Sequence, residues 1–329
     1  MIVFASAMAV IVVAEMCARA LSPYLPAPRL WADETTAAKV AQMDSRGGSC
    51  TDLVLAGDSM GRDAFVPATF TQADPNHRSA YNASLDAASP GLLSRWIQEE
   101  VLGRLHPATV VLALASLDVN TNSRAIGSMR TNYEAAPLSR AGAWGDVEAW
   151  AVNSSALLRH RVELRQPSVL WDSFARARDG EAAPRRDAAG LIGTDGEGLT
   201  RRNITYSGGS ATRAFLDDQL LNDFVLDQDG LRVEGELMDA LGSRGISVAL
   251  VILPVTDDYA NSHAGAFSAF MDSVNRLATD HQTPLIDLHD RAEPSSFADT
   301  HHLNASGAGW FSRSLASELD SRHVIARRC

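Results

Sequence analysis

Four short, largely apolar runs recur along the chain, and each is followed by polar residues. An apolar run of this length is typical of a strand that is buried on both faces of a parallel sheet. The four runs cover residues 52–57, 109–117, 246–255 and 284–288. We therefore predict four central strands, the first of which ends in a tight turn at Gly57.

The stretches that precede the later strands have the spacing of helices. They cover residues 90–105, 211–243 and 264–280. Strands that alternate with helices predict an α/β fold, with a parallel sheet covered on both faces. Right-handed crossovers place the carboxyl end of every strand at one edge of the sheet, where ligands bind in such folds. Reactive residues that directly follow a strand are therefore the first candidates for a functional site.

The N-terminal segment carries no charge before Glu15. Fourteen uncharged residues are fewer than the roughly 20 apolar residues that a membrane span needs, and residues 18–20 form a small-x-small cleavage signal. We therefore expect residues 1–21 to be a signal peptide or a membrane anchor, which places the protein outside the cytoplasm. A buried core helix is the alternative.

The rest of the chain divides into a linker and one large domain. Residues 22–50 contain three prolines and a Gly-Gly pair, which predicts a linker, and the folded domain then covers 51–329. Within that domain, residues 121–210 fit the alternation poorly and contain charged clusters at 176–187 and 195–202. We expect an insertion there that forms a lid over the strand edge.

The net charge and the cysteine content reduce the number of expected partners and kinds of site. The 329 residues include 29 basic and 40 acidic side chains, for a formal net charge of −11. Such a surface repels phosphate backbones, so nucleic acid is not an expected partner. The three cysteines form no Cys-x-x-Cys pair and no cluster with histidine, so no metal site is expected. After export, Cys50 and Cys329 can form a disulfide, and two free thiols are the alternative.

A candidate nucleophile follows the first predicted strand. Ser59 lies in the segment LAGDSMGRD, where Gly57 and Gly61 let the chain turn sharply. A serine on a strand-to-helix turn projects its hydroxyl from the strand edge, but it needs a base within hydrogen-bond reach. Backbone N–H groups at the start of the next helix are suited to a developing oxyanion. A simple turn or helix cap is the other interpretation of this motif.

A candidate acid–base pair follows the last predicted strand, in the segment FADTHHLNASGAGWF. Asp299 and His302 are three residues apart there. At this spacing the carboxylate can accept the imidazole Nδ1–H and leave Nε2 to take a serine proton. The neighbouring His301 is a rival base. Because both segments follow strands, we expect Ser59, His302 and Asp299 at one sheet edge as nucleophile, base and orienting acid.

On Gly57-Asp58-Ser59 and on the sequence DTHHLN at 299–304, the chain resembles the SGNH/GDSL-type hydrolases. The resemblance implies a flavodoxin-like three-layer α/β/α sandwich with a parallel sheet. It also implies esterase or acyltransferase chemistry through an acyl-serine intermediate, with no metal and no cofactor.

The other motif blocks of that family supply oxyanion donors. The resemblance implies oxyanion or substrate-binding roles for Asn82 and Ser84 in the second block, and for Asp118 and Asn120 in the third. Leu117 stands where the family usually has the oxyanion asparagine. Since loss of one such donor typically costs about 10²–10³ in rate, this departure implies a substitute donor, a slow enzyme or lost catalysis.

The order of these motifs after an apolar N-terminus is similar to one branch of the family, the extracytoplasmic proteins of alginate acetylation and teichoic acid D-alanylation. That likeness implies O-acyl transfer or ester hydrolysis on a cell-surface polysaccharide, with O-acetyl as the expected group. It also implies a membrane-bound O-acyltransferase as a partner. The alternative is a catalytically weak or inactive protein of the same fold that binds glycan as a scaffold.

Overall fold

The structure is a computed structural model of the chain, and it describes residues 2–26, 35–123, 142–181, 191–209, 220–221, 223–262 and 264–325. Cys329, the predicted partner of Cys50, lies outside these residues. The chain divides into two compact units, and each is described by itself. We call residues 1–38 and 132–188 the helical unit, and residues 39–131 and 189–329 the sheet unit.

Five strands form the sheet: β1 (Leu53–Ala56), β2 (Ala80–Asn82), β3 (Thr109–Leu114), β4 (Ser247–Ile252) and β5 (Leu285–Asp287). All of them are parallel, in the order β2-β1-β3-β4-β5. In register, Leu55 of β1 lies between Asn82 of β2 and Val111 of β3. Every side chain of β1, β2 and β3 is buried, because both faces of the sheet are covered.

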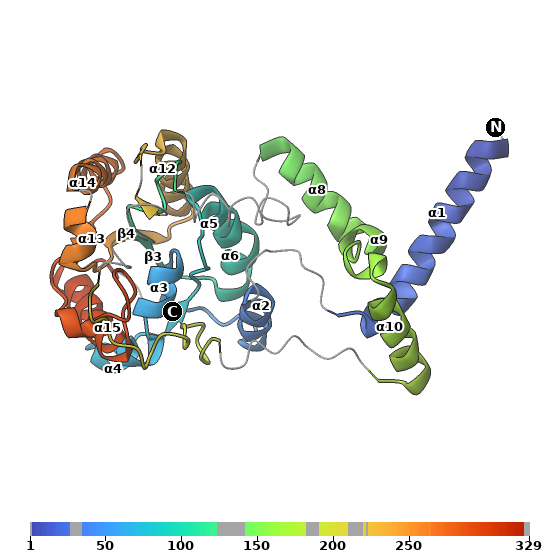
Figure 1. Ribbon diagram of the computed structural model, residues 1–329, viewed down its shortest axis with the longest axis horizontal. Helices are drawn as coiled ribbons and strands as arrows, with labels where there is room; N and C mark the ends of the chain where they lie inside the picture. The colour runs from blue at the N-terminus through green and yellow to red at the C-terminus, as the bar shows by residue number, and fades with distance from the viewer. Residues whose placement is uncertain are drawn as a thin grey trace. The chain divides into compact units, whose positions relative to one another are not determined.

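Helices cover both faces of the sheet. On one face, α12 (Gln228–Ser243) packs against α5 (Pro90–Trp96), and α14 (Ala264–Asp280) lies beside α12 (Figure 1). On the other face, α15 (Ala305–Ser321) packs against α3 (Ser59–Ala64) and α4 (Pro67–Ala73). The short helix α13 (Asp257–Ser262) follows β4. The predicted α/β class, the parallel sheet and the three-layer arrangement are confirmed.

Some local features differ from the sequence prediction. Within the stretch 211–243, residues 223–227 are not helical, and α12 begins at Gln228. The strand β2 was not predicted, because three residues are too few to show a periodic signal. The helix expected over residues 90–105 is interrupted by a π-helical turn at Ile97–Val101, which separates α5 from α6 (Leu102–Leu105). The four strands that the apolar runs predict are all present, and each is shorter than its run.

The stretch 22–50 is not a linker throughout, because the helix α2 (Thr36–Ser45) lies within it. Lys39 of this helix is completely buried. Its Nζ donates hydrogen bonds to the carbonyl oxygens of Asn82, at 2.7 Å, and Gly196, at 2.6 Å. These bonds compensate for the burial of the ammonium group and make α2 from Lys39 onward a part of the sheet unit.

The described residues of the helical unit form four α-helices: α1 (Ile2–Leu21), α8 (Gly142–Ser154), α9 (Ala156–Arg159) and α10 (Pro167–Asp179). Short connections join α8 to α9 and α9 to α10. Glu15 connects α1 to the start of α9, because its carboxylate accepts hydrogen bonds from Ser155 Oγ at 2.7 Å and from the Ala156 N–H at 2.9 Å. The hydrogen bond from Arg19 lowers the pKa of Glu15 to about 2. The middle of the predicted insertion is thus helical and packs with the N-terminal helix.

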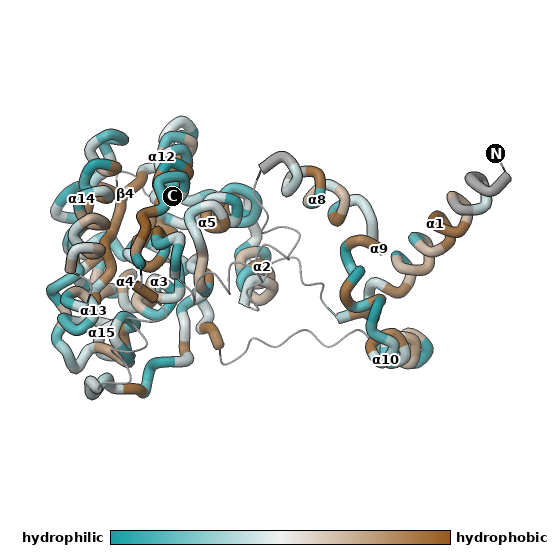
Figure 2. Tube along the Cα trace, turned by 45° about the horizontal axis from the view of Figure 1, so that its top comes forward, coloured by the Kyte–Doolittle hydropathy of each residue, from teal (hydrophilic) through white to brown (hydrophobic). Residues whose placement is uncertain are grey.

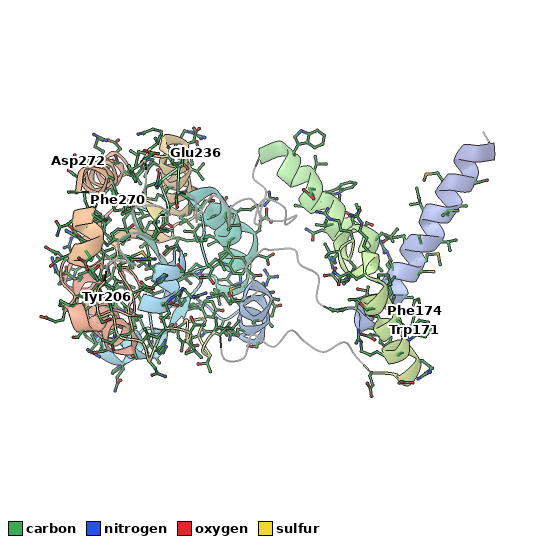
Figure 3. All side chains as sticks on the ribbon, viewed as in Figure 1. Trp171, Phe174, Tyr206, Glu236, Phe270 and Asp272 are labelled. Carbon is green, nitrogen blue, oxygen red and sulfur yellow. The ribbon has the colours of Figure 1, made fainter. Side chains whose placement is uncertain are left out.

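Many apolar side chains of the helical unit are exposed. Figure 2 shows hydrophobic residues in brown along the middle of α1. Four consecutive residues of α1, Val10 to Val13, are each more than half exposed. Trp171 and Phe174 project from α10 and are 78% and 60% exposed (Figure 3). Across the residues that the structure describes, we find no helix with both the length and the apolar character required to cross a membrane.

Candidate active site

Ser59 is the first residue of α3 and directly follows the turn after β1. Asp58 caps this helix, and its carboxylate accepts a hydrogen bond from the Met60 N–H at 2.9 Å. Gly57 lies against β3, where an added Cβ atom would be 2.7 Å from the carbonyl oxygen of Ala113. Only glycine fits this close approach, which fixes the turn that carries Ser59 to the carboxyl edge of the sheet.

His302 and Asp299 lie on the loop between β5 and α15. His302 Nε2 is 2.9 Å from Ser59 Oγ, and His302 Nδ1 is 2.8 Å from Asp299 Oδ2. Asp299 Oδ1 in turn accepts hydrogen bonds from the backbone N–H groups of His301 and His302, at 3.0 and 2.8 Å. With Nδ1–H donated to the carboxylate, Nε2 is the nitrogen that accepts the Ser59 hydroxyl proton. The structure thus brings together a serine, an imidazole and a carboxylate in the order that nucleophilic catalysis needs.

The environment keeps Asp299 ionised. Burial alone would raise its pKa, but the hydrogen bond from His302 and the charges of His301 and His302 hold the pKa of Asp299 well below its ordinary value. The carboxylate is therefore available as an acceptor for Nδ1–H over the pH range in which a serine nucleophile works.

His301, the rival base, occupies a different environment. Burial and the neighbouring His302 lower the pKa of His301 to about 3, so this ring is neutral near pH 7. Its Nδ1 lies 3.0 Å from Thr300 Oγ1, and its ring centre lies 4.2 Å from that of His302. His301 therefore packs against the catalytic candidate, while His302 makes the hydrogen bond to Ser59.

Charged residues form a network beside this triad. Asp63 of α3 is buried and accepts hydrogen bonds from Arg62 Nε at 3.0 Å and Arg201 Nη1 at 2.6 Å. Arg62 also pairs with Asp86 through Nη1. Arg201 Nε lies 3.6 Å from Asp299 Oδ2, so the network extends to the triad itself.

The segment 191–206, which is the last part of the predicted insertion, lies over this edge of the sheet. Its Gly198 N–H donates to the carbonyl oxygen of Arg62 at 2.9 Å. The Tyr206 hydroxyl (Figure 3) donates to Asp258 Oδ2 at 2.7 Å. Asp258 belongs to α13, which follows β4, so the segment contacts residues at the ends of two different strands.

Asn82 and Ser84, the predicted donors of the second block, are engaged in structural hydrogen bonds. Asn82 is completely buried. Its Nδ2 donates to the carbonyl oxygens of Gly61, Arg62 and Phe65, at 3.1, 3.0 and 2.8 Å. Its Oδ1 accepts from the Ser84 N–H at 3.1 Å. Asn82 thus holds α3 in place, and the Ser84 N–H that the prediction assigns to an oxyanion already has a partner.

Asp118 and Asn120, the predicted donors of the third block, brace the loop after β3. Asn120 Nδ2 donates to the carbonyl oxygen of Leu220 at 2.9 Å, and its Oδ1 accepts from the Val225 N–H at 3.2 Å. Asp118 Oδ2 accepts from the Ala115 N–H at 3.1 Å. The role of these side chains in binding an oxyanion or substrate stays a prediction.

Asp118 also contributes to a buried acidic pair behind the nucleophile. Asp58 is 1% and Asp118 is 4% exposed. Burial raises the pKa of Asp58, against the opposing effects of the His302 charge and of a hydrogen bond with Asp118. Burial therefore favours the protonated form of Asp58 more than it is favoured in an exposed aspartate.

Asp299, His301 and His302 also have the chemistry of metal ligands. One ligand atom from each lies within 4.8 Å of the others. The hydrogen bond from His302 Nδ1 to Asp299 Oδ2 accounts for the position of two of the three residues, and this bond orients His302 toward Ser59. The geometry therefore fits a hydrogen-bonded triad better than a ligand set.

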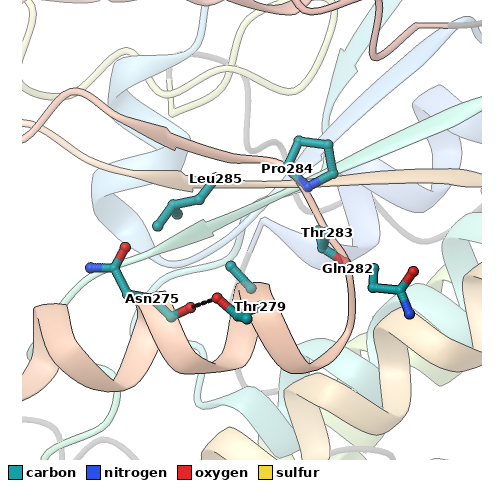
Figure 4. Close-up of a pocket in the computed structure, with 7 residues that line it drawn as sticks. Asn275, Thr279, Gln282, Thr283, Pro284 and Leu285 are labelled. Atoms are coloured by element: carbon teal, nitrogen blue, oxygen red, sulfur yellow. Dashed lines mark hydrogen bonds between the residues drawn. The ribbon is translucent and has the colours of Figure 1, made fainter.

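A pocket at the opposite edge of the sheet offers less chemistry. It lies at the end of α14 and the start of β5, between Asn275 and Leu285 (Figure 4). Amide, hydroxyl and apolar groups line it, and the only hydrogen bond drawn there is from Thr279 Oγ1 to the carbonyl oxygen of Asn275, at 2.8 Å. Because no acid, imidazole or amine lines this pocket, it is not a candidate for acid–base catalysis.

Comparison with known proteins finds likeness in solved structures alone. No protein-family model matches the sequence, and no curated protein matches it. A lipase/acylhydrolase from Enterococcus faecalis is 12% identical with a TM-score of 0.41, and 82% of this chain and 95% of that chain are covered. An acetyl xylan esterase is 15% identical with a TM-score of 0.39, covering 82% of this chain and 98% of that one. These values are too low to assign a family, so the functional argument rests on the site.

Sequence reasoning missed Arg201 and its connection to Asp299. The charged cluster at 195–202 was visible, but nothing local in it indicates a bond to residues that are about 100 and 140 positions away. Arg62 and Asp63 follow Ser59 closely, and their position on the same short helix is the one signal that could have pointed to a charged network here.

Proposed function

We propose that the protein is a serine-dependent esterase or O-acyltransferase that acts through Ser59, His302 and Asp299. The observation that carries this proposal is the continuous hydrogen-bond chain from Ser59 Oγ through both imidazole nitrogens to Asp299 Oδ2. A serine hydroxyl is a weak nucleophile unless a base accepts its proton. Here the base is within reach, and a carboxylate fixes its tautomer.

In the proposed first step, Ser59 Oγ attacks the acyl carbonyl carbon while its proton passes to His302 Nε2. Asp299 stabilises the imidazolium, and the Ser59 backbone N–H stabilises the oxyanion. Collapse of the tetrahedral intermediate breaks the ester bond, and His302 gives its proton to the leaving alkoxide oxygen. The product is an acyl-serine. Water or a sugar hydroxyl then attacks the acyl carbon, His302 takes the proton of the attacking oxygen, and Ser59 Oγ leaves and regains a proton from His302.

We further propose an O-acetyl group on a cell-surface polysaccharide as the substrate, and a membrane-bound O-acyltransferase as a partner. Both come from the motif order of the chain. Hydrolysis and transfer use the same three residues, so they differ in whether water or a sugar hydroxyl reaches the acyl-serine. The segment 191–206 lies beside the triad and is the part of the described chain best placed to influence that choice.

The expected location is outside the cytoplasm, with the helical unit in contact with a membrane. The exposed apolar residues of α1 and the exposed Trp171 support this, because tryptophan favours the boundary between lipid and water. Vesicle flotation of the full chain tests it. Val12→Asp should reduce the floated fraction several-fold, and Asn275→Asp in the sheet unit should leave it unchanged. Equal flotation of both variants would contradict the proposal.

Turnover of p-nitrophenyl acetate tests the catalytic proposal. Ser59→Ala should lower kcat/KM by about 10³-fold or more. Ser243→Ala is the matched control, because its exposed Oγ bonds to the carbonyl oxygen of Ala240 at the end of α12; this variant should retain full activity. Unchanged turnover in Ser59→Ala would overturn the proposal.

A second candidate function is glycan binding without efficient catalysis. The buried Leu117 in place of an oxyanion asparagine favours it, together with the structural role of the Asn82 and Asn120 side chains. Calorimetric titration with acetylated and deacetylated oligosaccharides distinguishes the two functions. A scaffold binds both forms without releasing acetate, whereas an esterase releases acetate from the acetylated form.

A further inference from the structure

Arg201 is placed so that it contacts two acidic groups of the site at once. Its Nη1 donates to Asp63 Oδ2 at 2.6 Å, and its Nε lies 3.6 Å from Asp299 Oδ2. The second oxygen is the one that accepts His302 Nδ1–H, at 2.8 Å. A cation and an imidazole therefore share one carboxylate oxygen.

The position of Arg201 is fixed by a rigid anchor. Asp63 lies one helical turn after Ser59 on α3, and its side chain is 3% exposed. Burial opposes its ionisation, but the charges of Arg62, His302 and Arg201 hold the pKa of Asp63 below its ordinary value. The ionised Asp63 therefore holds Arg201 by a charge-assisted hydrogen bond, the stronger class of such bonds. The Arg201 side chain itself is 31% exposed.

We propose that Arg201 is a positioning residue of the triad, which orients Asp299 and opposes the positive charge on His302. This inference rests on the proposed function, because it assigns Arg201 a role at that same site. The Arg201 guanidinium interacts with the Asp299 carboxylate, which also interacts with the His302 imidazole. Without Arg201, the negative charge of Asp299 would act on His302 with no cation beside it. Loss of the guanidinium should therefore change both the orientation of Asp299 and the charge that surrounds the His302 imidazole.

Other titratable and charged groups also lie near the His302 imidazole and contribute to the electrostatic potential at its ring. The ionised Asp63 from α3 interacts with His302 through its negative charge, and Asp58 from the turn before Ser59, whose pKa is raised by burial, also interacts electrostatically with His302. The His301 ring lies 4.2 Å from the His302 ring at an interplanar angle of 42°, and it is neutral near pH 7. Arg62 pairs with Asp63 on the same helix. Since these groups remain in an Arg201 variant, a change in the pH profile reports the loss of the guanidinium.

The test is the pH dependence of kcat/KM for p-nitrophenyl acetate in the full chain, with Arg201→Gln, Arg201→Lys and Arg202→Gln compared with the wild type. Arg202 is the matched control, because it belongs to the same segment and its Nε donates to the carbonyl oxygen of Gly198. Arg201→Gln should lower kcat/KM at pH 8 by ~10-fold and move the acid limb of the profile up by about 0.5 pH unit. Arg201→Lys should restore most of the limb position, and Arg202→Gln should stay within about twofold of the wild type.

The outcomes separate this inference from the proposed function. If Ser59→Ala abolishes turnover and the acid limb of Arg201→Gln coincides with that of the wild type, Arg201 is a structural residue and the inference is wrong, whatever the loss of rate. If Ser59→Ala retains full turnover, the proposed function itself has failed. Thermal unfolding of each variant shows whether a loss of rate reflects loss of the fold. If a variant is partly unfolded, the pH of the acid limb measured on the remaining active fraction still shows whether Arg201 affects the pH profile.

Discussion

The sheet unit and the helical unit differ in how far their large apolar side chains are exposed to solvent. Phe70 and Phe311 of the sheet unit are completely buried, whereas Trp150 and Trp171 of the helical unit are 70% and 78% exposed. Burial of apolar area is the main favourable term in folding, and large exposed apolar surfaces usually mark sites of interaction. The sheet unit is therefore stabilised by its own core, while the exposed apolar side chains of the helical unit are not used for internal packing.

The proposed chemistry follows the same division. Ser59, His302, Asp299 and Arg201 all belong to the sheet unit, and the contacts described for them are made within it. Substitutions in the sheet unit should therefore affect catalysis and stability strongly. Substitutions of exposed residues in the helical unit should affect both weakly.

The largest effect is expected for Asp299→Asn. The amide cannot accept Nδ1–H in the same way and favours the wrong tautomer of His302, so kcat/KM should fall by about 10³–10⁴-fold. Steady-state kinetics on p-nitrophenyl acetate measures this. Asp257→Asn is the control, because Asp257 is exposed at the start of α13. A loss of less than tenfold in Asp299→Asn would show that the carboxylate does not orient a catalytic base.

A direct comparison of the two units comes from one aromatic truncation in each. Phe311→Ala removes a ring from the interior of the sheet unit and should lower the free energy of unfolding by about 3–5 kcal/mol. Trp171→Ala removes an exposed ring from α10 and should change it by less than about 0.5 kcal/mol. Urea unfolding, followed separately for each unit, measures both values. Equal losses would mean that Trp171 is buried in the folded protein and that the contrast between the units is wrong.

A smaller and pH-dependent effect is expected at Glu234 of α12. The side chain is completely buried, and burial raises the pKa of Glu234 from 4.5 to about 8. The folded protein keeps this proton in a range where the unfolded chain has lost it. The stability that Glu234 contributes is therefore fully present below pH 4.5 and is lost as the pH rises toward 8, by roughly 3 kcal/mol between pH 5 and pH 8.

Glu234→Gln removes the titrating group, so the fall in the free energy of unfolding between pH 5 and pH 8 should shrink by that amount. Glu236→Gln is the control on the same helix, because the Glu236 side chain is 62% exposed. Urea unfolding at the two pH values measures the difference. An unchanged pH dependence in Glu234→Gln would mean that this carboxyl is ionised in the folded state.

Local sequence patterns predicted the sheet and the triad because each signal lies within a few residues. The apolar runs correspond to strands whose two faces are buried, and Asp299 and His302 lie within one turn of the chain. The shared position of Ser59 and His302 followed from the rule that parallel strands end at one edge. The short strand β2 and the helix α2 gave no comparable signal.

Contacts between residues that are far apart in the chain could not be predicted from these local sequence patterns. Arg201 contacts Asp63 and Asp299 from a segment whose composition resembles a solvated loop. The buried Lys39 donates hydrogen bonds to the carbonyl oxygens of Asn82 and Gly196. In both cases the contact depends on how distant segments pack in three dimensions. The charge and hydropathy along the sequence do not indicate which residues will be in contact. The same holds for Asn82, whose amide is used to hold α3.

Mass-spectrometric mapping of a fluorophosphonate adduct is the most direct test of the central claim, that His302 activates the Ser59 hydroxyl. Activation of Ser59 by His302 should give one modified peptide, labelled at Ser59, in the wild-type chain, and no labelling in a folded His302→Ala variant. No adduct at Ser59, or equal labelling of Ser59 with and without the imidazole, would contradict it.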